Sequence, residues 1–191
     1  MGVDCMAWIT TIDENDAENQ LKKYYEDIIK KRGKLSNILQ VQSLLPDTMK
    51  SHLDFYLSIM FNKSKIRREE KELIAVIVSS LNNCQYCINH HAEALSCYWK
   101  DWKSIQDVIA NTDQSKVLNE NQKKLVRYVK KLTTCPSEIV QPDIEELRQS
   151  GYDDRSILEI ALIVSYFNFV NRMALGLGVV YNEEEMKGYR Y

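Results

Sequence analysis

The run from Leu73 to Val78 is apolar at every position, and this feature restricts the fold of the chain most. In a soluble chain, a helix without a polar side must be buried all round, so the run predicts a helix at the centre of the core. Its β-branched residues would equally suit a buried parallel strand, but no alternation of strands and helices surrounds the run. Only 6 glycines and 3 prolines interrupt the 191 residues. We therefore expect an all-α fold.

Amphipathic patterns predict further helices on both sides of this run. Their apolar residues recur at three- and four-residue spacing, as on a helix with one buried face. Gly33 and Pro136 lie where helices end, and Asp101 and Asp153 lie where helix N-caps are expected. The predicted helices cover residues 16–31, 46–62, 67–81, 84–99, a segment after Asp101, 122–133, 142–149 and 157–177.

The length of the chain fits one domain, residues 1–191, because domains of roughly 100 to 200 residues are the usual size. Within it, residues 1–34 form an N-terminal helical segment and residues 183–191 a peripheral tail. A formal net charge of -2 gives no electrostatic reason to expect nucleic acid or a membrane surface as a partner. The first residues lack a basic and then apolar leader, and no uncharged stretch reaches roughly 18 residues, so a cytoplasmic protein is expected.

Two thiols and two imidazoles converge in the segment from Cys84 to His91. On a helix that begins at Cys84, the side chains of Cys87 and His91 share a face with it. A cysteine attacks only as a thiolate, which a helix N-terminus and a nearby base favour. Side chains on a helix lean toward its N-terminus, which directs His91 at Cys87, with His90 as a second candidate. In such a pair, one cysteine can be oxidised and the other can close a disulfide.

Two other interpretations of the cysteine pair are open: inert buried thiols, or half of a zinc site. A structural zinc ion requires a fourth ligand beyond the two cysteines and one histidine, and His52 and the other cysteines lack ligand-like spacing. The odd count of 5 cysteines also argues against a framework of structural disulfides. We therefore expect redox chemistry and no metal, and the absence of a glycine-rich phosphate loop gives no reason to expect ATP or NAD.

The chain resembles the alkylhydroperoxidase D-like, or carboxymuconolactone decarboxylase-like, superfamily, and within it the peroxidase-related branch. Members carry a glutamate, eleven further residues, and then Cys-x-x-Cys-x-x-x-His. This chain has that spacing at Glu72, Cys84, Cys87 and His91. Residues 67–76, 166–172 and 176–179 also look like that branch, so the resemblance extends from about Leu35 onward.

The resemblance implies an all-helical protein that forms a homo-oligomer, a trimer or hexamer, and reduces hydroperoxides. Cys87 would be the peroxidatic cysteine, and Cys84 would resolve its sulfenic acid as a disulfide. Glu72 and His91 would form the proton relay. No bound cofactor is implied, because a partner protein that carries a dithiol such as a lipoyl group would regenerate the pair.

Tyr86 departs from the family pattern, because the best-characterised peroxidase relay has a histidine between the two cysteines. Tyrosine is a poor base but a competent hydrogen-bond donor. Peroxidase activity would then be weaker, or replaced by disulfide reduction or redox sensing. A zinc-binding interaction module and a lactone decarboxylase of the same superfamily are also open, although decarboxylase members need no dithiol.

Two further interpretations concern neighbouring polar residues. Glu72 has Arg68 four residues before it, and the two could form only a surface salt bridge. Asn168, Asn171 and Arg172 interrupt an otherwise apolar helix. We expect these three to form a structural polar cluster or a subunit contact, because buried polar groups require hydrogen bonds.

Overall fold

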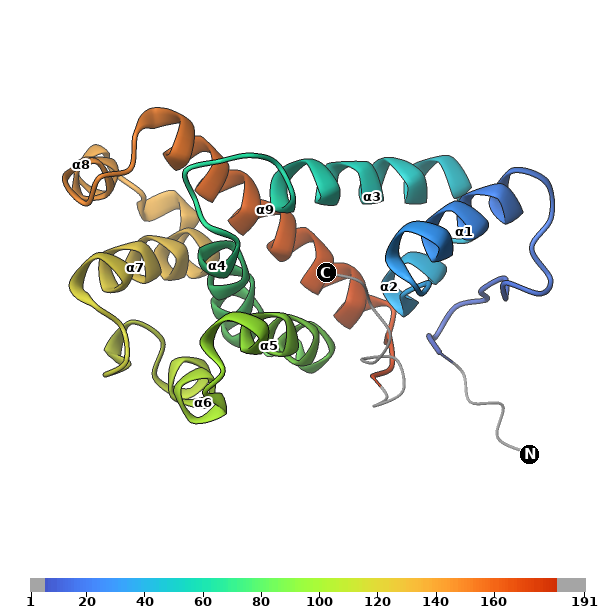
Figure 1. The fold of residues 1–191 in the computed structure, drawn as a ribbon, viewed down its shortest axis with the longest axis horizontal. Helices are drawn as coiled ribbons and strands as arrows, with labels where there is room; N and C mark the ends of the chain where they lie inside the picture. The colour runs from blue at the N-terminus through green and yellow to red at the C-terminus, as the bar shows by residue number, and fades with distance from the viewer. Residues whose placement is uncertain (1–5, 182–191) are drawn as a thin grey trace. The chain divides into compact units, whose positions relative to one another are not determined.

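The computed structural model describes residues 6–181, and these residues contain helices and no strand (Figure 1). This confirms the all-α prediction. The tail at residues 183–191 and the first five residues of the N-terminal segment lie outside the described residues. The helices are α1 (Asn19–Arg32), α2 (Asn37–Gln40), α3 (Pro46–Met60), α4 (Arg68–Leu81), α5 (Gln85–Trp99), α6 (Trp102–Asn111), α7 (Glu120–Thr134), α8 (Gln141–Gln149) and α9 (Asp154–Gly176), with short 3-10 turns at Thr112–Gln114 and Pro136–Glu138.

The predicted capping residues lie at the ends of their helices. Gly33 follows α1 with φ 85°, and its N–H donates to the carbonyl of Ile29. Asp101 accepts from the N–H of Lys103 at the start of α6, and Asp153 accepts from the N–H of Ser156 at the start of α9. The four-residue helix α2 was not predicted, because a single turn is too short to show a helical repeat.

The chain divides into two compact units. The terminal unit comprises residues 6–58 and 172–181, and the central unit comprises residues 59–171. Whether they fold as the single predicted domain stays a prediction. In the terminal unit, the N–H of Trp8 donates to the carbonyl of Leu177, and the N–H of Val180 donates to that of Met6. Its core consists of Ala17, Leu21, Tyr25, Ile28, Leu35, Leu39, Met49 and Leu53.

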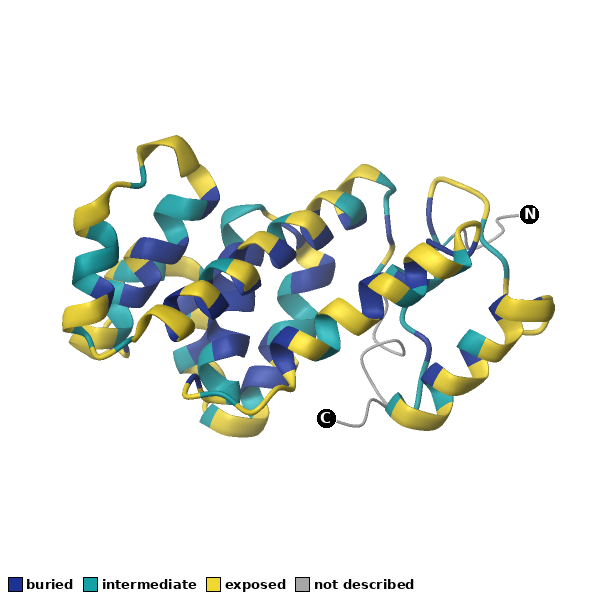
Figure 2. Cartoon of the chain, turned by 90° about the horizontal axis from the view of Figure 1, so that it is seen from above, coloured by how far each residue is buried: buried dark blue, intermediate teal, exposed yellow. Residues whose placement is uncertain are grey.

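Helix α4 is the buried centre of the central unit, as its sequence predicts. Each residue from Leu73 to Val78 is at most 1% exposed, whereas most other helices show both buried and exposed faces (Figure 2). The first turn of α4 also holds a buried ion pair, in which Lys71 Nζ lies 2.6 Å from Oε1 of Glu159 on α9. Lys71 donates to the carbonyl of Ile59 as well. Because both charges have close partners, the pair fixes α4 against α9 without leaving a buried charge uncompensated.

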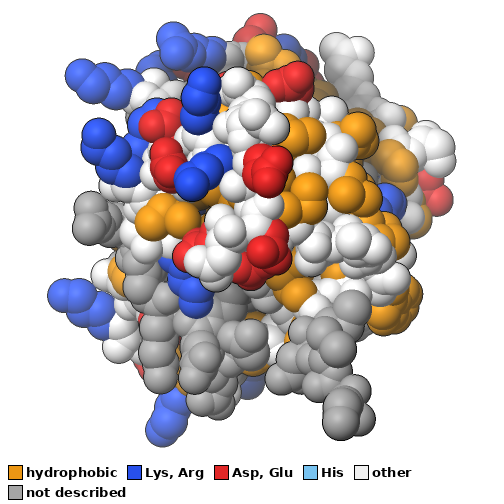
Figure 3. Space-filling model, turned by 90° about the vertical axis from the view of Figure 1, so that its right-hand side faces the viewer, with side chains coloured by type: hydrophobic (Ala, Val, Ile, Leu, Met, Phe, Trp, Pro, Cys, Tyr) orange, Lys and Arg blue, Asp and Glu red, His pale blue; other side chains and the backbone are white. Residues whose placement is uncertain are grey.

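Helix α9 is long and apolar enough to cross a membrane by length and composition alone. Of its most apolar window, 56% is buried within the fold. Core helices of soluble proteins meet the same criterion, so α9 does not point to a membrane protein. Elsewhere, hydrophobic side chains gather at parts of the surface (Figure 3), which is normal for folded proteins.

Gly33→Ala is expected to destabilise the protein by about 1 kcal/mol, because a left-handed φ disfavours any residue with a Cβ. Gly176→Ala is the matched control, since an added Cβ there meets no atom within 4 Å, and alanine is the better helix former. Urea unfolding of both variants measures the difference. An unfolding free energy of Gly33→Ala equal to that of the wild-type protein would show that the C-cap of α1 contributes nothing.

Candidate active site

The two cysteines lie where α4 turns into α5. Asn83 has φ 54°, and the N–H of Cys84 donates back to the carbonyl of Ser79 at 3.0 Å. This tight connection makes Cys84 the N-cap of α5. Cys87 follows in the first turn of the helix. Both sulfurs therefore lie at the helix end where the backbone dipole favours negative charge.

The sulfur atoms of Cys84 and Cys87 are 2.6 Å apart, closer than two unbonded sulfurs normally approach. Both residues are free thiols, and they are only 1% and 2% exposed. The structure thus brings together the two residues that the sequence singled out as a redox pair. A disulfide between them would join sulfurs that are already neighbours.

The two thiols differ in their readiness to ionise. Contact with Cys87 lowers the pKa of the Cys84 thiol, although burial opposes this, and a backbone N–H at Cys87 lowers it further. Contact with Cys84, together with burial, raises the pKa of the Cys87 thiol. The two buried thiols interact so closely that their ionisation belongs to the pair rather than to either cysteine alone.

Glu72 and His91 also meet, across the interface between α4 and α5. His91 Nδ1 lies 2.7 Å from Oε2 of Glu72. The Glu72 side chain is fully buried, and that of His91 is 13% exposed. The ring of Phe167 contacts the His91 ring edge-on at a centroid distance of 4.5 Å. The imidazole of His91 therefore lies between the carboxylate of Glu72 and the ring of Phe167.

Arg68 holds the other oxygen of Glu72. Its Nε and a terminal nitrogen lie 2.7 and 2.6 Å from Oε1, and its guanidinium lies 3.8 Å above the centre of the Phe61 ring. The two side chains are 17% and 0% exposed, so this is not a surface salt bridge. Burial raises the pKa of Glu72, but the charges and hydrogen bonds of His91 and Arg68 outweigh it and lower the pKa overall. The carboxyl group is therefore ionised at neutral pH.

Asn171 belongs to the site as well, which the sequence did not predict. It is fully buried, and its Oδ1 accepts from Asn82 Nδ2 at 3.0 Å. Its Nδ2 donates to Ser79 Oγ at 3.3 Å, and its side chain partly offsets the rise in the pKa of Cys87. Asn168 and Asn171 thus form the expected polar cluster, together with Asn82, whereas a place for Arg172 in it stays a prediction. Polar residues in an apolar helix were the signal, but they did not reveal which residues they contact.

Tyr86 and His90, the possible supporting residues, lie one helical turn apart on α5. Their rings are 4.5 Å apart between centroids and inclined by 51°, and Tyr86 is buried. Helical geometry places them on the face next to that of Cys87 and His91.

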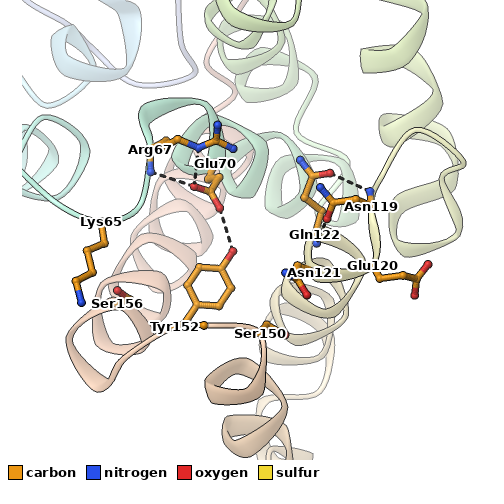
Figure 4. A pocket seen from close by; sticks show the side chains of 11 residues that line it. Lys65, Arg67, Glu70, Asn119, Glu120, Asn121, Gln122, Ser150, Tyr152 and Ser156 are labelled. Carbon is orange, nitrogen blue, oxygen red and sulfur yellow. Dashed lines mark hydrogen bonds and ion pairs between the residues drawn. The ribbon is translucent and has the colours of Figure 1, made fainter.

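Within residues 6–181, no group of three or more His, Cys, Asp or Glu side chains is placed to hold a metal ion. A polar cavity of about 460 Å³ lies elsewhere in the central unit, between the starts of α4 and α7 and the residues before α9 (Figure 4). The Tyr152 hydroxyl donates to Glu70 there. None of the four predicted site residues lines this cavity.

Comparison with known proteins agrees with this architecture. Residues 46–97 match the carboxymuconolactone decarboxylase family. A peroxidase-related protein from Silicibacter sp. TM1040 is 28% identical with a TM-score of 0.82, over 99% of this chain and 100% of that one. An alkylhydroperoxidase AhpD core protein from Ralstonia eutropha JMP134 is 23% identical with a TM-score of 0.84, over 95% of each chain. A debrominase in complex with 2,3,4-tribromopyrrole is 21% identical with a TM-score of 0.76, over 93% of this chain and 92% of that one.

Proposed function

We propose that the chain is a thiol-dependent hydroperoxide reductase, because residues 46–97 match the carboxymuconolactone decarboxylase family and the fold is similar to that of AhpD-like proteins. These similarities by themselves support a peroxidase-related or decarboxylase-like role. The observation that carries the narrower proposal is the pair of free thiols, 2.6 Å apart at the start of α5. A peroxidase that resolves its own sulfenic acid requires two such neighbouring sulfurs.

In the first step, the thiolate of Cys87 attacks the O–O bond of the hydroperoxide. A sulfur–oxygen bond forms and the O–O bond breaks, which leaves Cys87 as a sulfenic acid and releases an alkoxide that takes a proton to become the alcohol. In the second step, the sulfur of Cys84 attacks Cys87, a disulfide forms, and the sulfenic oxygen leaves as water. An external dithiol, such as a lipoyl group, then reduces the disulfide by thiol exchange.

His91 is the group that exchanges protons in this scheme. Glu72 is ionised and accepts at Oε2, so Nδ1 of His91 must donate to it. The other ring nitrogen, Nε2, is then the one that can bind or release a proton. His91 and Arg68 together keep Glu72 charged, so the carboxylate orients the imidazole and leaves proton transfer to it. In this arrangement, His91 is a base whose orientation is fixed by the buried carboxylate of Glu72.

Tyr86 remains the departure from the peroxidase pattern. As a hydrogen-bond donor beside His90, it can orient a neighbour, but it cannot serve as a base near neutral pH. We therefore place peroxide reduction first and disulfide reduction or redox sensing by the same dithiol second. A lactone decarboxylase would leave the paired thiols without a role.

The test is a count of free thiols before and after one equivalent of hydrogen peroxide or cumene hydroperoxide, followed by turnover with dihydrolipoamide. We expect two thiols to disappear together and to return with the reductant, while peroxide is consumed catalytically. A rate of peroxide consumption no higher than the rate with dihydrolipoamide alone would contradict the proposal. A peroxide substrate, a dithiol partner protein, self-association into trimers or hexamers and a cytoplasmic location stay predictions.

A further inference from the structure

A second cavity of the central unit, of about 360 Å³, lies beside the end of α7. Residues of α7, of α8 and of the two 3-10 turns line it. Its volume lies within the range of small-molecule sites, which starts at roughly 300 Å³. None of the four predicted site residues lines it, so the cavity is separate from the candidate active site.

Three ion pairs join α7 to the other walls of this cavity. They are Arg127–Glu146, Lys131–Asp143 and Lys130–Asp113, at 2.6, 2.7 and 2.8 Å. Each of the three cations has one carboxylate partner among the described residues and keeps further N–H donors. The walls are therefore fixed to one another, and they still offer donors to a ligand.

The buried Tyr128 side chain lines the cavity and is 7% exposed. Its hydroxyl has no hydrogen-bond partner among residues 6–181, whereas the hydroxyls of Tyr25 and Tyr152 donate to the Ile12 carbonyl and to Glu70. Among the described side chains, only Ser80 Oγ is both sealed from solvent and without a partner. The Tyr128 oxygen is therefore not sealed, and the cavity is the space that it reaches. Because buried hydroxyl groups normally have partners, this one is left for a molecule in the cavity.

Cys135 adds a free, partly exposed thiol to the same wall. Its N–H donates to the carbonyl of Lys131 at 2.8 Å, and its carbonyl accepts from the N–H of Glu138 at 2.9 Å. These two bonds fix the backbone of Cys135 between α7 and the turn that follows. A small molecule reaches a thiol in a cavity wall more readily than the surface of another protein does.

The charges of the wall favour a ligand that carries both signs. The three cations offer spare donors to a carboxylate. The carboxylate of Glu138, which also lines the cavity and has no ion-pair partner among residues 6–181, can accept from an ammonium group. A small zwitterion, such as an amino acid or a short peptide, has both groups. If it also contains a disulfide, it can form a covalent bond with Cys135.

We propose that Cys135 is a modification site, at which a small zwitterionic disulfide leaves one of its halves bound in the cavity as a mixed disulfide. The Cys135 thiolate attacks one sulfur of the disulfide, a new sulfur–sulfur bond forms, and the old one breaks. The other half leaves as a thiolate and takes up the proton that Cys135 released. Cys135 is oxidised and the leaving half is reduced, so the disulfide itself is the oxidant. This step requires no reaction at Cys84 or Cys87.

The experiment compares two reagents, zwitterionic glutathione disulfide and the uncharged bis(2-hydroxyethyl) disulfide. The initial rate of Cys135 modification is measured at increasing concentrations of each by mass spectrometry under non-reducing conditions. Trypsin places Cys135 in a peptide without any other cysteine. The proteins are the wild type, Tyr128→Phe and the matched control Tyr152→Phe, whose hydroxyl donates to Glu70 outside this cavity. Tyr128→Phe breaks no hydrogen bond of the described residues, so its urea unfolding should match that of the wild type.

We expect the wild-type rate to saturate with glutathione disulfide, because binding precedes exchange, and to rise linearly with the uncharged reagent. Tyr128→Phe should raise the half-saturating concentration about two- to tenfold, which is the effect of one hydrogen bond, and Tyr152→Phe should leave it unchanged. Glu138→Gln should raise it as well and provides the measurement if Tyr128→Phe does not fold. A linear rate with glutathione disulfide, an unmodified Cys135, or equal half-saturation in the wild type and the folded cavity variants overturns the proposal.

Discussion

Cys87→Ser is expected to abolish peroxide turnover, with a fall in kcat/KM of at least about a thousandfold, because a serine hydroxyl cannot replace a thiolate as nucleophile toward an O–O bond. Cys84→Ser should abolish multiple turnover too, but for a different reason. Its Cys87 still reacts once, and the sulfenic acid then lacks a partner. Peroxide consumption with dihydrolipoamide measures the first effect, and trapping of sulfenic acid with dimedone measures the second.

Cys97→Ser is the control for this pair of variants. Cys97 is an exposed thiol on the same helix α5, and its loss should leave turnover unchanged. The two site variants also settle which sulfur attacks. Sulfenic acid on Cys84 in the Cys87→Ser protein, and none on Cys87 in the Cys84→Ser protein, would reverse the assigned roles. The lowered pKa of Cys84 makes this the decisive comparison.

Glu72→Gln should cost about 3–5 kcal/mol of stability and most of the activity, because it leaves the guanidinium of Arg68 partly buried without its counter-charge. The double variant Arg68→Met/Glu72→Gln removes both charges and should recover much of the stability. Activity should stay low in it, since His91 still lacks its carboxylate. Urea unfolding and peroxide turnover measure the two quantities separately.

Glu69→Gln serves as the matched control on α4. Glu69 pairs with Arg67 at 2.5 Å, but the two side chains are 25% and 68% exposed. Exposed pairs contribute roughly 0–1 kcal/mol, so this substitution should be nearly neutral. If Glu72→Gln lost no more stability than Glu69→Gln, the buried pair of Arg68 and Glu72 would contribute nothing to stability.

The acid side of the stability curve tests the same group. The pKa of Glu72 is lowered in the folded protein, below its unfolded value of about 4.3. Its contribution to stability is therefore complete above about pH 5 and is lost as the pH falls through the folded pKa. The wild-type protein should lose stability on acidification more steeply than Glu72→Gln does. Parallel curves for the two proteins would contradict the ionised, paired state of Glu72.

Much of this site could be predicted from local sequence. The apolar run before it indicated the buried helix α4, and the spacing of cysteines and histidine indicated the first turns of α5. Helical spacing also indicated that Arg68 and Glu72 are neighbours. Their burial could not be predicted, because it depends on the chain before α4, where Phe61 covers the guanidinium.

The contacts of Asn171 with Asn82 and Ser79 could not be predicted from the sequence for a similar reason. These residues are far from Asn171 along the chain, and only the packing of α9 against α4 brings them together. A polar residue in an apolar helix indicates that it has a partner, but periodicity carries no information about which distant helix supplies that partner.

The burial of the two sulfurs has a kinetic consequence. In the proposed reaction, thiols that are 1% and 2% exposed would not meet a bulky hydroperoxide in the resting conformation, so we expect the reaction to follow a transient local opening. The observed rate constant is then the intrinsic rate constant multiplied by the fraction of molecules that are open. Small peroxides need the smallest opening. For the proposed reaction, we therefore expect the protein surface around α5, rather than the thiols themselves, to set the order of reactivity among peroxides of different size.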